Sequence, residues 1–167
     1  MNSTQVFRQF AFLLIYFFLQ IVFFRVLVIA DLAFCFVYIG FILFLPHETS
    51  DFWVILLSFL IGLMVDLFYN TAGVHAAAST AMGYLRGFVV RGIFSNRGGD
   101  ADIQLSWEGM GTERFIRYLI ILVTIHHLLL FFIEVGHVDY LVLTILKTLG
   151  SVVYSVVVIS FLHRVLQ

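Results

Sequence analysis

Residues 52–67, FWVILLSFLIGLMVDL, form an apolar run that carries an ionisable side chain, Asp66, near its end. A charged side chain at the centre of a membrane helix costs roughly 2.5–3.5 kcal/mol on insertion scales, and less near the interface. A chain that carries this cost uses the group for helix packing or for function. The alternative is a carboxylate that snorkels toward the outer interface or caps the turn at residues 70–73.

The rest of the chain is equally apolar. Of its 167 residues, 62% are hydrophobic and 11% are charged, whereas soluble domains are nearer ~45–50% apolar and ~25% charged. The sequence therefore predicts one integral membrane domain, residues 1–167. The net charge of −1 argues against a nucleic acid partner. The single cysteine, Cys35, excludes a disulfide framework and a cysteine-rich metal site.

The apolar runs predict an all-α bundle of six transmembrane helices. A spanning helix needs about 20 apolar residues, and the run 10–45 is too long for one helix, so it should divide where Arg25 and Asp31 supply charges. The expected helices are 9–28, 31–46, 52–69, 72–94, 114–135 and 139–163, with a loop at 95–113. Five helices are the alternative, if 10–45 is arranged differently.

Arginines predict the orientation. Six spans place both termini on one side, and Arg25 is the only arginine expected on the other, with Lys147 inside the last helix. By the positive-inside rule, the termini and the loop 95–113 are cytoplasmic. The arginines on that side either contact anionic membrane lipids and partner proteins or only determine topology: Arg8, Arg86, Arg91, Arg97, Arg114, Arg117 and Arg164.

Small residues predict a tight hairpin of the third and fourth helices. Gly62 and Asp66 are four residues apart and share a helix face. The fourth helix carries small residues at close to four-residue spacing: Gly73, Ala77, Ala81, Gly83 and Gly87. Small residues let helix backbones approach closely in lipid, where packing drives helix association.

Two partners are possible for Asp66. Lys147 lies at a similar expected depth, about 12 Å from the outer end of its helix against about 8 Å for Asp66, at ~1.5 Å rise per residue. His75 begins the fourth helix, and an Asp–His pair can move protons. The alternative for His75 is a plain interfacial histidine.

Other candidate chemistry is sparse. His126 and His127 are adjacent, so they point to different faces, and neither has a ligand-type residue four positions on. Asp100 and Asp102 lie in a glycine-rich loop that is more simply a solvated connector. We find no serine elbow, phosphate loop or pair of catalytic carboxylates. The sequence therefore predicts no metal site, no cofactor and no enzymatic activity.

The stretch FLIGLMVDL, residues 59–67, with GVHA at 73–76 and the helix reaching Tyr84, resembles the rod shape-determining protein MreD family. That family shares a G-x-x-x-D-L segment, a short turn that ends in glycine, and a small-residue helix. Gly62, Asp66 and Gly73 match its positions, and His75 falls inside the segment. The sequence departs from the family at Ala72, where a bulkier residue or proline is frequent, and in its longer loop 95–113.

The resemblance implies a non-enzymatic scaffold in the bacterial inner membrane that maintains rod cell shape during peptidoglycan synthesis. It implies association with an MreC-like scaffold protein, and indirectly with a RodA-type glycosyltransferase and a penicillin-binding transpeptidase. The implied fold is similar to the substrate-binding subunits of energy-coupling-factor transporters, with an internal pocket.

Such a transporter subunit is itself the alternative function. It would bind a small molecule in a polar or aromatic pocket and work with paired ATPases. Residues that can contribute to a pocket of this kind are Tyr16, Tyr38, Tyr69 and Trp53. A lipid-modifying enzyme is a third class. It would need paired acids or a nucleophile, and we find neither in the sequence.

Overall fold

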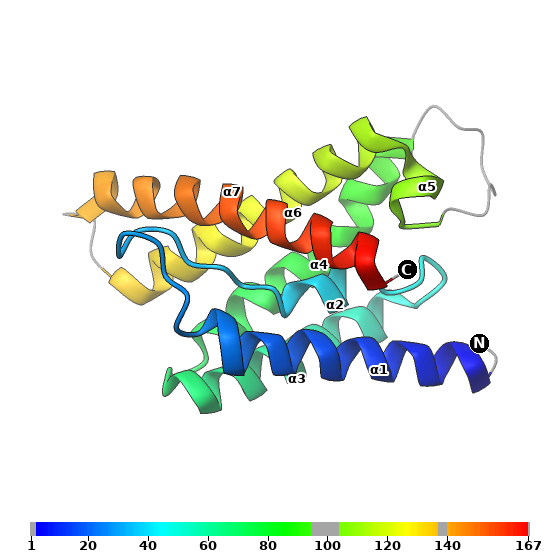
Figure 1. Cartoon of the computed structure of the whole chain (residues 1–167), viewed down its shortest axis with the longest axis horizontal. Helices are drawn as coiled ribbons and strands as arrows, with labels where there is room; N and C mark the ends of the chain where they lie inside the picture. Colours follow the sequence, from blue (N-terminus) through cyan, green and yellow to red (C-terminus); the bar gives the residue numbers. More distant parts are fainter. Residues whose placement is uncertain (1–2, 95–103, 137–139, 167) are drawn as a thin grey trace.

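The described part of the chain is all-helical. A computed structural model describes residues 3–94, 104–136 and 140–166 (Figure 1). It contains α1 (Ser3–Leu19), the π-helical turn η1 (Gln20–Phe24), α2 (Ile39–Leu43), α3 (Asp51–Tyr69), α4 (Val74–Phe94), α5 (Trp107–Met110), α6 (Thr112–Val135) and α7 (Leu141–Leu166). Asp100, Asp102, Arg97 and most of the predicted loop 95–113 lie outside the described residues.

Four helical stretches are long and apolar enough to cross a membrane: 7–24, α3, α6 and α7. The chain is therefore a membrane protein. A further long helix, α4, packs between α3 and α6. Both ends of the chain lie at the same end of the bundle (Figure 1).

The predicted helix 31–46 is wrong. The chain leaves the helical conformation after Phe24, near the expected break, but residues 25–38 form an irregular segment that we call the strap. Ala30 and Asp31 adopt left-handed conformations with φ of 52° and 55°, which a continuing helix does not allow. Only the five residues of α2 become helical. In Figure 1 the strap runs from the end of α1 toward α7 and returns into the bundle.

Two serines of α7 bind the returning half of the strap. The N–H of Phe34 donates to Ser151 Oγ (2.9 Å), and the N–H of Phe36 donates to Ser155 Oγ (3.1 Å). Irregular backbone persists at membrane depth only where protein satisfies its polar groups. These hydroxyls therefore replace the bonds that a helix would have made within itself.

Gln20 of η1 makes further hydrogen bonds to the strap. Its Nε2 donates to Cys35 O (3.2 Å) and to Tyr69 Oη (2.6 Å), and its Oε1 accepts from the N–H of Tyr38 (3.3 Å). One buried amide thus ties η1 and α3 to the strap.

We expect Ser155→Ala to lower the free energy of unfolding by about 1–3 kcal/mol, because it leaves the buried N–H of Phe36 and Nε2 of His127 without their partner. Ser160→Ala is the matched control, since the buried hydroxyl of Ser160 on the same helix has no hydrogen-bond partner. Unfolding in mixed micelles with increasing dodecyl sulfate measures both. Equal stability of the two variants would contradict the assignment of Ser155 as a strap contact.

The predicted hairpin is confirmed. A Cβ on Gly62 would lie 2.6 Å from both Ala76 Cα and His75 O, so α3 and α4 are in backbone contact there. The turn between them uses left-handed conformations at Asn70 (φ 56°) and Gly73 (φ 84°). The predicted helices 52–69, 72–94, 114–135 and 139–163 correspond to α3, α4, α6 and α7.

Candidate functional site

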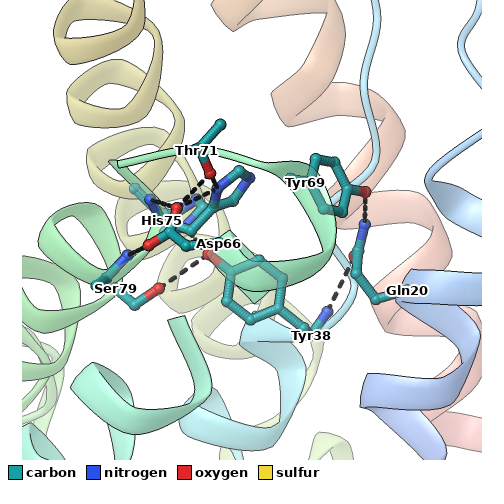
Figure 2. A network of polar contacts seen from close by, with 9 residues as sticks. Gln20, Tyr38, Asp66, Tyr69, Thr71, His75 and Ser79 are labelled. Atoms are coloured by element: carbon teal, nitrogen blue, oxygen red, sulfur yellow. Dashed lines mark hydrogen bonds and ion pairs between the residues drawn. The ribbon is translucent and has the colours of Figure 1, made fainter. Parts of the chain in front are cut away.

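Asp66 joins α3 to the start of α4. Its carboxylate is 2% exposed and accepts the backbone N–H of His75 (3.0 Å) and of Ala76 (2.9 Å), together with the hydroxyl of Thr71 (Figure 2). Free N–H groups and the helix dipole favour a negative charge at a helix N-terminus. Asp66 is therefore a cap of α4 supplied by the preceding helix. The capping alternative is confirmed, and the snorkelling one is wrong.

His75 completes this arrangement. Its Nδ1 lies 3.0 Å from Asp66 Oδ1, which assigns a proton to Nδ1. The ring is 3% exposed and packs against Tyr69 at 4.9 Å between centroids. The predicted Asp–His pair is present, and the reading of His75 as a plain interfacial residue is wrong.

The predicted pair of Asp66 and Lys147 is not formed. Lys147 Nζ lies over the ring of Phe34, 5.5 Å from its centroid, while Asp66 is bound within the hairpin. Similar depth along two helices does not fix which faces meet. Here the strap lies against α7, as the serine contacts to Phe34 show.

His126 and His127 on α6 are both fully buried, and they were predicted to point to different faces of the helix. His126 Nε2 lies 2.7 Å from Tyr38 Oη, which also bonds Ser79 Oγ at 2.9 Å. His127 bonds Val123 O through Nδ1 (2.8 Å) and Ser155 Oγ through Nε2 (3.0 Å). Two adjacent histidines therefore connect α6 to the strap, α4 and α7.

These side chains surround the ring of Phe36, which is 4% exposed. Within the described residues, seven rings have centroids 5.2–6.5 Å from that of Phe36. One is Phe34 of the strap itself; the other six we call the chamber wall, and they belong to Tyr38, Tyr69, His75, His126, His127 and Phe131. Sequence reasoning named Tyr38, Tyr69 and His75 but not the enclosed Phe36. Within the described ranges no three histidine, cysteine, aspartate or glutamate side chains are grouped so as to hold a metal ion.

The other predicted pocket residues lie elsewhere. Trp53 is 54% exposed on the outer surface of α3. Tyr16 is buried against Gly40, where an added Cβ would come within 2.6 Å of its ring. Neither belongs to the chamber wall.

Arg86 is not a surface arginine. It is 3% exposed, and it donates to the carbonyl of Leu45 and to Tyr118 Oη (3.3 Å), which in turn donates to Leu43 O (2.7 Å). Cations favour helix C-termini, so Arg86 stabilises the end of α2. A role in contacting lipid is excluded for this residue in the folded bundle.

The outer face of α3 and α4 carries an apolar groove of about 600 Å³. Its lining combines large side chains of α3 with small ones of α4: Ile55, Phe59, Leu63, Gly73, Ala76, Ala77, Thr80, Ala81 and Tyr84. The hydroxyl of Thr80 donates to Ala76 O within its own helix (2.6 Å), so the groove presents hydrocarbon.

No protein-family model, no curated protein and no solved structure matches this chain.

Proposed function

We propose that the chain is a non-enzymatic scaffold of the bacterial cell-wall elongation machinery, of the MreD type, located in the inner membrane. The groove on α3 and α4 is the observation that carries the proposal. Its occupant is the transmembrane helix of a single-span partner, an MreC-like scaffold protein. A RodA-type glycosyltransferase and a penicillin-binding transpeptidase then join indirectly.

A helix fits this groove by its chemistry. Ala77, Thr80 and Tyr84 follow one face of α4 over about 10 Å at ~1.5 Å rise per residue, and Gly73 extends the groove into the turn before it. Helices associate in lipid where small residues let backbones approach and van der Waals packing replaces lipid contacts. The motif residues Gly62, Asp66, Gly73 and His75 hold α3 and α4 in register behind this face.

The topology in this proposal is six crossings with both termini in the cytoplasm. The strap with α2 makes the second crossing and α4 the fourth. The end of the bundle that holds both termini also holds the beginning of α6 with Arg114 and Arg117 (Figure 1). This distribution supports a cytoplasmic position for that end.

The groove predicts a separable loss of partner binding. We expect Ala77→Trp to reduce recovery of an MreC-like protein at least tenfold, because Ala77 is exposed in the groove and an indole fills it without entering the core. Val153→Trp is the matched control, because Val153 lies on α7 and is 66% exposed. This variant should bind the partner as the unmodified protein does. The measurement is purification through a C-terminal tag in mild detergent, followed by mass spectrometry.

Each result of that experiment is informative. Recovery of the MreC-like protein with both variants would overturn the groove as its site. Recovery instead of a coupling subunit with paired ATPases would overturn the elongation role. It would favour the second candidate, a small-molecule-binding subunit of an energy-coupling-factor transporter, for which the enclosed ring of tyrosines and histidines is the supporting observation.

A further inference from the structure

The ring of Phe36 lies inside a wall of unusual composition for an apolar side chain. Its nearest ring neighbours are His127 at 5.2 Å, His75 at 5.4 Å and His126 at 5.9 Å. All three histidines are at least 97% buried, since their exposed fractions are 0–3%. Leucine or phenylalanine would fill the same positions at no cost in buried polar atoms.

Two of these histidines have ring nitrogens without a partner. His75 Nε2 and His126 Nδ1 are buried and form no hydrogen bond, while the opposite nitrogen of each ring is held by Asp66 and by Tyr38 respectively. A phenyl ring offers them neither a donor nor an acceptor. Unpaired buried polar groups are rare and call for an explanation.

Phe36, whose ring fills the space inside the chamber wall, belongs to the strap rather than to a helix. Phe36 is held by one backbone bond to Ser155, and its neighbours are held by Ser151 and Gln20. Residues 25–27 and 29–32 of the strap are exposed. Residues 35–38 are themselves buried, so displacing Phe36 requires the strap's backbone bonds to Ser151, Ser155 and Gln20 to break, but it requires no unwinding of α1, α3, α6 or α7.

We propose that the chamber wall is a binding site for a small, neutral, planar heteroaromatic molecule, and that Phe36 is the group which this molecule displaces. Flat rings on several sides select a planar ligand. His75 Nε2, opposite the protonated Nδ1, requires a donor on the ligand, and His126 Nδ1 requires an acceptor when Tyr38 donates to Nε2 of the same ring. A neutral ligand is favoured because the carboxylate of Asp66 is already engaged by the hairpin and burial penalises an unpaired charge. This proposal does not depend on the groove or its partner.

A pair of matched probes tests the wall. Phe36→Ala makes room for a ring, and 4-methylpyrazole and toluene have similar shapes, but only the pyrazole carries a donor and an acceptor. At ten times its dissociation constant a ligand should raise Tm by about 3–6 °C for a chain of this size. We expect 4-methylpyrazole to bind Phe36→Ala at least tenfold more tightly than toluene. Phe41→Ala, an equally buried position on α2, should not show this preference.

The unmodified protein tests displacement. Cys35 is the single cysteine, is 1% exposed and adjoins Phe36, so its reaction with a maleimide reports withdrawal of the strap. We expect 4-methylpyrazole to accelerate this reaction at least threefold. Val65→Cys in a Cys35→Ala background, buried to the same degree in α3, should be unaffected.

Either negative result overturns the proposal. Tighter binding of toluene would show that the space left by Phe36 is only an apolar hole. An unchanged labelling rate of Cys35 would show that the strap does not yield to a ligand, and this readout remains decisive if Phe36→Ala fails to fold.

Discussion

Asp66→Ala is expected to lower the free energy of unfolding by about 3–5 kcal/mol, because each buried donor left without its acceptor costs about 1–3 kcal/mol and the carboxylate serves several of them. The substitution leaves the N–H groups of His75 and Ala76 and the hydroxyl of Thr71 without their common acceptor. It also leaves His75 Nδ1 without its partner. Water cannot easily replace the carboxylate, since Asp66 and His75 are 2% and 3% exposed.

The loss should be specific to position and to geometry. Asp51→Ala removes an exposed carboxylate from the first turn of the same helix and should lower stability by no more than about 1 kcal/mol, the value of its interaction with the helix dipole. Asp66→Asn should fall between the two, because an amide keeps one acceptor oxygen but presents a donor to N–H groups. Unfolding by dodecyl sulfate, followed by circular dichroism, compares the three. If Asp66→Ala were as stable as Asp51→Ala, the carboxylate would not be the link between α3 and α4.

The hairpin was predictable because its signals are local. Gly62 and Asp66 lie one turn apart on α3, and Gly73 and His75 follow within ten residues of Asp66. Helical periodicity alone places such residues on one face. The partner of Asp66 was the less certain part, since Lys147 and His75 both remained open. Nothing in the sequence decided between them, and the structure contains the pair with His75.

The strap was not predictable from composition. Residues 32–45 are apolar, and a continuous apolar run has the same composition whether it is helical or extended. What makes it irregular is distant in sequence: Ser151 and Ser155 bond residues 117–119 positions earlier. The position of a single serine in an apolar helix does not indicate which backbone N–H group its hydroxyl will accept.

The chamber wall could be predicted only in part, for the same reason. Its wall draws on the strap, α3, α4 and α6, so no window of sequence contains it. His126 and His127 looked unpromising because neither has a ligand-type neighbour one turn away. Their partners are Tyr38 and Ser155 on other elements. The available signal was two adjacent histidines in an apolar helix, where burial is costly unless each finds a bond.

Gly62→Val is expected to separate α3 from α4 and to lower the free energy of unfolding by about 3 kcal/mol, the upper end of the usual cost of overpacking. The new Cβ would meet Ala76 Cα and His75 O at 2.6 Å, and these are backbone atoms that cannot rotate away. Moving α4 outward also lengthens the bonds from Asp66 to His75 and Ala76. The steric change therefore removes the cap as well.

Gly92→Ala is the matched control for this second substitution. It too lies inside a helix, but a Cβ there meets no atom within 4 Å. Because alanine is a better helix former than glycine by about 1 kcal/mol, this variant should be at least as stable as the unmodified protein. Cysteine pairs across α3 and α4, tested for crosslinking in each background, report the separation directly. Unchanged crosslinking in Gly62→Val would contradict a hairpin held by direct backbone contact, and the register of the groove would then need another cause.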